Sequence, residues 1–168
     1  MLTGPFASSL QGEPRATHDI DLVVELRPES CRALIEGLKR PELDVNQEAA
    51  ERVVAQKSGL FNLINSETGD KVDFWILTGE KFDQARFRRR QTVEVLGLSL
   101  EVSSPEDTIL MKLKWARQSG GSQKHSVDAL RVYEVNREFL NLKYLGEWVS
   151  SLGLQEQWEA LLHQARPI

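Results

Sequence analysis

The chain has 168 residues, of which 25 are acidic and 21 are lysine or arginine, so its formal net charge at pH 7 is −4. Hydrophobic residues make up 40% and charged residues 27%, which is typical of an ordinary globular domain and argues against a protein that coats nucleic acid. No apolar run reaches the roughly 20 residues of a membrane span, and no basic and then apolar leader opens the chain. We therefore expect a cytoplasmic globular protein without a membrane partner.

The first half of the chain reads as mixed helices and strands. Gly4 and Pro5 open a short helix, and branched residues predict a strand from Asp19 to Leu26. A helix follows in which Cys31 shares an apolar face with leucine and isoleucine residues, so this single cysteine is a core residue and not a reactive thiol. The remaining elements of this half are a helix over 46–57, a hairpin of strands 60–65 and 71–77, a helix over 80–90 and a second hairpin over 91–102.

The second half is predicted to be wholly helical. Ser104 caps a helix that has Pro105 in its first turn. Four helices are expected, over residues 105–118, 123–136, 142–152 and 154–165. We expect two parts, an α/β core over 1–103 and a helical region over 104–168.

The candidate chemistry starts with two aspartates on the first long strand. Asp19 and Asp21 project from the same face, about 6.5–7 Å apart along the chain, because alternate residues of a strand share a face. Two such carboxylates repel each other unless a cation or a proton lies between them, and Mg²⁺ accepts carboxylate oxygens. The spacing alone is weak evidence, since Glu42 and Asp44 repeat it in a stretch that reads as a solvated loop.

A third carboxylate, Asp73, lies within an apolar strand, where it is costly to bury without a partner. If this strand pairs with the first, Asp73 joins Asp19 and Asp21, and a metal could neutralise all three. The alternative is that Asp73 pairs with a lysine or arginine at the sheet surface. The pattern by itself leaves both interpretations open.

The run from Gly12 to Leu22, Gly-Glu-Pro-Arg-Ala-Thr-His-Asp-Ile-Asp-Leu, together with Gly4 and Val72-Asp73-Phe74, resembles the signature of the DNA-polymerase-beta-like nucleotidyltransferase superfamily. The resemblance is greatest to small bacterial members, including toxin-type enzymes of abortive-infection systems. It extends more loosely over the helices after Ser104. The fold implied is a nucleotidyltransferase-like mixed sheet flanked by helices, with a C-terminal helical bundle.

The resemblance implies an Mg²⁺-dependent enzyme (Mn²⁺ is an alternative) that moves a nucleoside monophosphate from an NTP such as ATP to a protein or RNA acceptor. Asp19, Asp21 and Asp73 would be the metal ligands and catalytic residues of an in-line displacement that releases pyrophosphate. The residues expected to bind the nucleotide are Gly4, Arg15, Lys112 and Asp128. Toxin-type relatives also imply a cognate antitoxin.

Each of the more distant site residues has a plainer interpretation. Lys112 is either a phosphate contact or a surface charge, and Arg15 either orients phosphate or caps the aspartate pair. Asp128 either contacts Lys112 or the ligand, or is an exposed helical aspartate. A basic run is formed by Arg86, Arg88, Arg89 and Arg90. It either contacts a triphosphate or an RNA backbone, or it is a solvated helix end. The three histidines make no zinc pattern.

Two departures from the family pattern favour an alternative function. Pro5 replaces the usual serine after the glycine, and only Met1, Leu2 and Thr3 precede Gly4. Either the start is truncated or the family's strand before the glycine is missing, and a missing strand would expose a sheet edge. The alternative is a nucleotide-binding or partner module of the same fold without turnover. A metal-dependent phosphodiesterase is a third hypothesis, although such sites usually recruit histidines.

Overall fold

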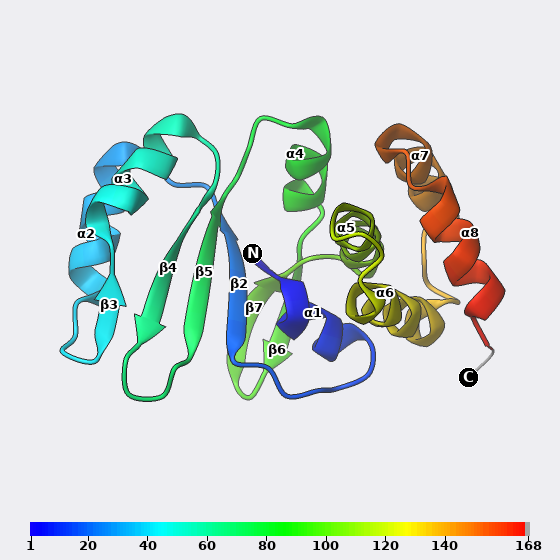
Figure 1. Cartoon of the computed structure of the whole chain (residues 1–168), viewed down its shortest axis with the longest axis horizontal. Coiled ribbons are helices and arrows are strands. Elements are labelled where there is room, and N and C mark those ends of the chain that lie inside the picture. The colour runs from blue at the N-terminus through cyan, green and yellow to red at the C-terminus, as the bar shows by residue number, and fades with distance from the viewer. Residues whose placement is uncertain (167–168) are drawn as a thin grey trace. The chain divides into compact units, whose positions relative to one another are not determined.

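The computed structural model describes residues 1–166 and has a mixed α/β architecture, as predicted (Figure 1). The chain divides into two compact units. The first contains residues 1–6 and 16–102, and the second contains residues 7–15 and those from 103 onward. Helix α1 (Gly4–Gln11) therefore begins in the first unit and ends in the second. Among the described residues, none of the helices combines the length and the apolar character needed to cross a bilayer.

The first unit is built on a mixed sheet. Its strands are β1 (Leu2–Thr3), β2 (Asp19–Val24), β3 (Leu43–Val45), β4 (Leu60–Asn65), β5 (Lys71–Ile76), β6 (Gln91–Val95) and β7 (Leu98–Val102). Their order across the sheet is β3-β4-β5-β2-β1-β7-β6. The pairs β2–β5 and β1–β7 are parallel, and the other neighbours are antiparallel. Both predicted hairpins are confirmed, the second with Leu96 and Gly97 at positive φ in its turn.

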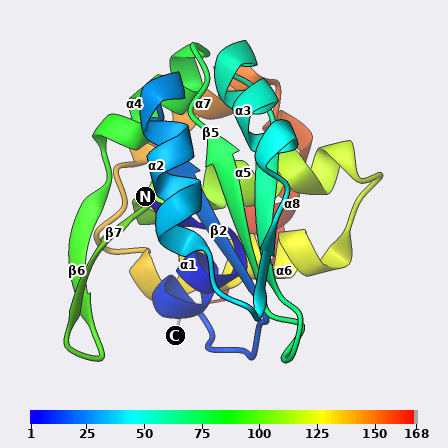
Figure 2. The same ribbon diagram turned by 90° about the vertical axis from the view of Figure 1, so that its left-hand side faces the viewer.

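Two helices cover one face of the β4–β5–β2 part of this sheet (Figure 2). They are α2 (Pro28–Leu38) and α3 (Gln47–Gln56). Cys31 is fully buried in this core, as predicted, and its burial raises the pKa of the thiol. Phe61 and Phe74 stack beneath the helices with their ring centroids 4.8 Å apart. The apolar side of β2 and β5 thus packs inward, which leaves their aspartates on the opposite face.

Three features of this unit differ from expectation. The stretch that reads as a solvated loop contains the edge strand β3, whose Asp44 is exposed but whose backbone pairs with β4. Leu2 and Thr3 form the two-residue strand β1 between β2 and β7. The alternative of a missing strand before Gly4, with the sheet edge that it would expose, is therefore wrong. In α4 (Lys81–Arg88), Arg86 is buried and donates to Asp83.

The second unit is helical. Its helices are α5 (Pro105–Gln118), α6 (Gln123–Asn136), α7 (Leu142–Leu152) and α8 (Gln155–Gln164), together with the end of α1. Along the second half of the chain this unit begins at residue 103, and residues 7–15 are grouped with its helices. The reason lies in their contacts: the Gln11 side chain donates to the Ser103 carbonyl, and Asn136 donates to the Gln11 carbonyl.

Candidate active site

The first unit places two of the predicted aspartates directly opposite each other. Strands β2 and β5 run side by side and parallel, with Asp21 paired in register with Asp73 and Asp19 paired with Lys71 (Figure 1). Since alternate residues of a strand share a face, all four side chains project from the same face of the sheet. The condition under which Asp73 would join Asp19 and Asp21, the pairing of their two strands, is therefore met.

Neighbouring side chains of the sheet hydrogen-bond both of the buried carboxylates. Asp21 and Asp73 are each only 8% exposed. The indole N–H of Trp75 donates to Oδ1 of Asp21 over 2.8 Å, and the amide of Asn62, which lies opposite Asp73 on β4, donates to Oδ1 of Asp73. These bonds orient the carboxylates and reduce the cost of burying them.

Lys71 brings a positive charge to two of the aspartates. Its Nζ lies 2.9 Å from Oδ2 of Asp73 and 3.9 Å from Oδ1 of Asp19. The hydrogen bond to Asp73, together with the charges of all three aspartates, raises the pKa of Lys71. Of the two interpretations that the sequence leaves open for Asp73, the structure contains the pairing with a lysine.

Gly4 meets the site through its backbone. It adopts φ +67°, and a Cβ added there would lie 2.7 Å from Cγ and 2.9 Å from Cβ of Asp21. A side chain at this position would clash with the carboxylate, and positive φ disfavours any residue other than glycine. The glycine that opens α1 is thus required by its contact with Asp21.

The donor set fits a divalent cation held through few ligands. Within residues 1–166, no three His, Cys, Asp or Glu side chains are grouped so that they could hold a metal ion. However, Mg²⁺ is usually bound through one or two carboxylates, with waters and substrate phosphates completing its shell. Asp21 and Asp73 supply hard oxygen ligands from adjacent strands, with Asp19 beside them on the same face. The chemistry of these residues therefore suits Mg²⁺ through two carboxylates.

The other predicted binding residues form a separate cluster, within the second unit. Lys112 is 1% exposed, and its Nζ lies 2.5 Å from Oδ2 of Asp128. Arg15 approaches the same oxygen at 3.2 Å, and the Ser8 hydroxyl donates to it over 3.4 Å. Burial would raise the pKa of Asp128, but hydrogen bonds and charges from Lys112 and Arg15 lower it overall. Of the alternatives left open for Asp128, the structure contains the contact with Lys112, and Arg15 is the more accessible cation of the cluster.

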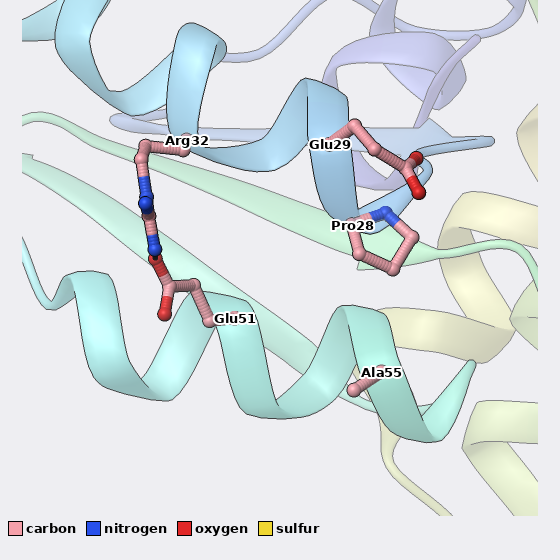
Figure 3. Close-up of a pocket in the computed structure, with 5 residues that line it drawn as sticks. All are labelled: Pro28, Glu29, Arg32, Glu51 and Ala55. Atoms are coloured by element: carbon pink, nitrogen blue, oxygen red, sulfur yellow. Dashed lines mark hydrogen bonds and ion pairs between the residues drawn. The ribbon is translucent and has the colours of Figure 1, made fainter.

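A groove between α2 and α3, of about 470 Å³, carries a different set of residues (Figure 3). Arg32 and Glu51 point toward each other across it, with Nη2 and Oε1 3.4 Å apart. A hydrogen bond from Gln47, supported by Arg32, lowers the pKa of Glu51. Its lining, drawn in Figure 3, includes none of the residues predicted for chemistry.

The sequence interpretation missed the roles of Asn62, Lys71 and the Trp75 indole. A usable signal existed for two of them. Asn62 is a polar residue inside an apolar strand, and Lys71 stands two positions before Asp73, hence on its face of the strand. The bond from Trp75 to Asp21 crosses from one strand to another, so only the register reveals it.

A scan against protein-family models found no match to the chain, and a search of curated proteins found no relative. The fold is of the α/β type, with a mixed sheet flanked by helices and a helical C-terminal region. Any assignment of function therefore depends on the residues of the site.

Proposed function

We propose that this protein is an Mg²⁺-dependent nucleotidyltransferase that moves a nucleoside monophosphate from an NTP to a protein or RNA acceptor and releases pyrophosphate. The observation that supports the proposal best is the register of β2 and β5, which sets Asp21 opposite Asp73 with Asp19 on the same face. Two carboxylates on adjacent strands, with a third beside them, offer oxygen ligands to a divalent cation, and the cation in turn binds the phosphates of the nucleotide.

Each residue has a distinct part in this proposal. Asp19 and Asp21 would hold Mg²⁺ against the triphosphate, and Asp73 would share a second metal or help to deprotonate the acceptor hydroxyl. When bound, Mg²⁺ neutralises charge on the phosphate oxygens. Trp75 and Asn62 keep Asp21 and Asp73 oriented through their hydrogen bonds. The backbone at Gly4 brings the N-terminus of α1 next to Asp21, and helix N-termini favour phosphate groups.

The proposed roles of Arg15, Lys112 and Asp128 divide by exposure. Arg15 keeps a 31% exposed side chain and is the residue of this cluster that we assign to phosphate binding. Lys112 and Asp128 form a buried ion pair, and Asp128 positions Arg15 by accepting hydrogen bonds from its guanidinium. Their effect on the nucleotide is therefore indirect in this proposal.

Transfer is tested with the full-length chain and each of the four NTPs labelled at the α- or γ-phosphate, with Mg²⁺ or Mn²⁺ and with RNA or protein acceptors. We expect label from the α-phosphate alone to reach the acceptor. Asp21→Asn and Asp73→Asn should each reduce transfer by about 100-fold or more, since each removes part of the charge stabilisation. Asp44→Asn, on the exposed edge strand, is the matched control and should transfer normally. Absence of transfer from every NTP, or equal transfer by the aspartate variants, would contradict the proposal.

A second candidate is a nucleotide-binding module without turnover. It is favoured by the protein partners that Asp73 already has, Lys71 and Asn62, and by Pro5, which lacks an N–H for a phosphate. Isothermal titration calorimetry separates the two candidates. Binding of an NTP with Mg²⁺ in the absence of any transfer would select the module.

A further inference from the structure

Lys71 occupies a particular place among the aspartates. Lys71 and Asp73 are two residues apart on β5, and Asp19 and Asp21 are two apart on β2, with Asp19 opposite Lys71 and Asp21 opposite Asp73. The four side chains therefore stand at the corners of one patch of sheet, three of them negative and one positive. Lys71 therefore offsets part of the negative charge of the three aspartates.

The contacts of Lys71 use oxygen atoms that a cation would also use. Oδ1 of Asp73 accepts a hydrogen bond from Asn62, and Oδ2 accepts the ammonium of Lys71 at 2.9 Å. The same ammonium lies 3.9 Å from Oδ1 of Asp19. A divalent cation ligated by Oδ2 of Asp73 would meet this positive charge within a few ångströms, and like charges at that distance repel.

We propose that Lys71 is an internal counter-ion of the aspartate cluster, which competes with the divalent cation for Asp73 and must withdraw before the cation binds. This inference rests on the proposed function, because it takes the cation to bind at these aspartates. The side chain of Lys71 is 35% exposed, so its ammonium can leave Asp73 and be hydrated without unfolding the strand. The lysine thus holds the carboxylates together without metal and sets the cation concentration at which the site is loaded.

The competition predicts that removal of the positive charge strengthens cation binding. In Lys71→Gln and Lys71→Met, the dissociation constant of Mg²⁺ should fall by about tenfold, the scale of one charge a few ångströms away at a partly exposed site. Lys71→Arg keeps the charge and should bind Mg²⁺ no more tightly than the unmodified protein. Lys39→Gln is the matched control. Lys39, which directly follows α2, also pairs with a carboxylate, since its Nζ lies 2.6 Å from Oε1 of Glu36. Its substitution should leave Mg²⁺ affinity unchanged.

The readout is calorimetric titration of the full chain with Mg²⁺ alone, and then with Mn²⁺, without nucleotide. Thermal unfolding with and without Mg²⁺ provides a second readout, in which the gain in midpoint should be larger for Lys71→Gln than for the unmodified protein. Circular dichroism establishes that each variant is folded, and the two neutral substitutions guard against a defect specific to one of them.

The outcomes separate this inference from the proposed function. Tighter binding in both neutral variants but not in Lys71→Arg or Lys39→Gln supports the competition. Equal dissociation constants in the unmodified protein and both neutral variants overturn the competition and leave the metal site standing. If neither cation binds to any of these proteins, the metal site itself is overturned, and the inference with it.

Discussion

At the scale of single residues, Gly4 is the position where a single methyl group should do most harm. Gly4→Ala places a Cβ 2.7 Å from Cγ of Asp21 in a backbone conformation with φ +67°. The strain of that conformation and the displacement of Asp21 together should lower the free energy of unfolding by about 2–4 kcal/mol. Urea denaturation followed by circular dichroism measures the change.

Gly37 provides the matched control for this substitution. It lies within α2, and a Cβ added there would meet no atom within 4 Å. Gly37→Ala should therefore stabilise the protein, by about 0.5–1 kcal/mol, because alanine loses less backbone freedom in a helix. Equal effects of the two substitutions would contradict the close approach of Gly4 to Asp21.

Asp128 connects stability to pH. Its carboxyl is buried, yet Lys112 and Arg15 hold its pKa below the usual value of 3.8 in the folded protein. A carboxyl with a depressed folded pKa stabilises the fold fully above its unfolded pKa. That contribution is lost as the pH falls through the folded pKa, so the unmodified protein should lose stability steeply below about pH 4.

The variant Asp128→Asn tests this pH dependence. It removes the carboxylate beside the buried Lys112 and should cost about 3–5 kcal/mol at pH 7, the scale for breaking a buried ion pair. Between pH 5 and pH 3 its unfolding free energy should fall less than that of the unmodified protein. Asp44→Asn, on the exposed edge strand, is the control and should follow the unmodified protein. A variant as acid-sensitive as the unmodified protein would assign the pH dependence to other groups.

The sequence identified the acidic residues of the site but not their partners. Alternation along one strand was sufficient to place Asp19 and Asp21 on one face, because strand geometry is local. That Asp73 joins them depends on the parallel pairing of β2 with β5, which alternation does not give. The hydrogen bonds from Asn62 and Trp75 depend on which strands are neighbours and in what register. Such contacts are set by the whole sheet, and no pattern within one strand encodes them.

At the scale of elements, α5 depends on its first turn. Ser104 is fully buried, accepts a hydrogen bond from the Asp107 N–H at 3.2 Å and donates to Oδ2 of Asp107 at 2.7 Å. Ser104→Ala removes both bonds and should lower the free energy of unfolding by about 2 kcal/mol, the upper end for a lost N-cap. Urea denaturation measures the loss.

The N-cap of α7 is the comparison for this prediction. Asn141 is exposed and accepts one hydrogen bond from the Tyr144 N–H at 3.0 Å. Asn141→Ala should therefore cost only about 1 kcal/mol. If Asn141→Ala costs as much as Ser104→Ala, the second bond of Ser104 adds nothing to the stability of α5.

Long helices with clear ends were the easiest elements to predict, and short strands were the hardest. The segment from Ser104 to Gln118 has a cap, a proline in its first turn and an apolar face, so its helix is specified locally. The strand at Leu2 and Thr3 has only two residues, so it is too short to show an alternation of apolar and polar side chains. It exists because β2 and β7 pair with it on both sides, and this is tertiary information.

At the scale of the whole molecule, the division into units does not follow the order of the chain. Residues 7–15 belong with the C-terminal helices, where Arg15 and Ser8 bond to Asp128 and Gln11 exchanges hydrogen bonds with Ser103 and Asn136. The helix start at Ser104 and the run of predicted helices after it marked one boundary in the sequence. The contribution of the early segment was not visible there, because it depends on contacts over more than 90 residues of separation.

Residues 7–15 should be required for the helical unit to fold by itself. A fragment of residues 103–168 lacks the segment that pairs with Asp128, so the buried Lys112–Asp128 pair loses its cover and the fragment should unfold without a cooperative transition. Residues 7–15 joined ahead of residue 103 through a flexible linker of about 12 residues, which spans roughly 20 Å, should restore a cooperative thermal transition. A fusion that carries the same nine-residue segment in scrambled order is the control. Circular dichroism melting compares the three proteins, and a bare fragment that melts as cooperatively as the fusion would show that residues 7–15 are dispensable to the helical unit.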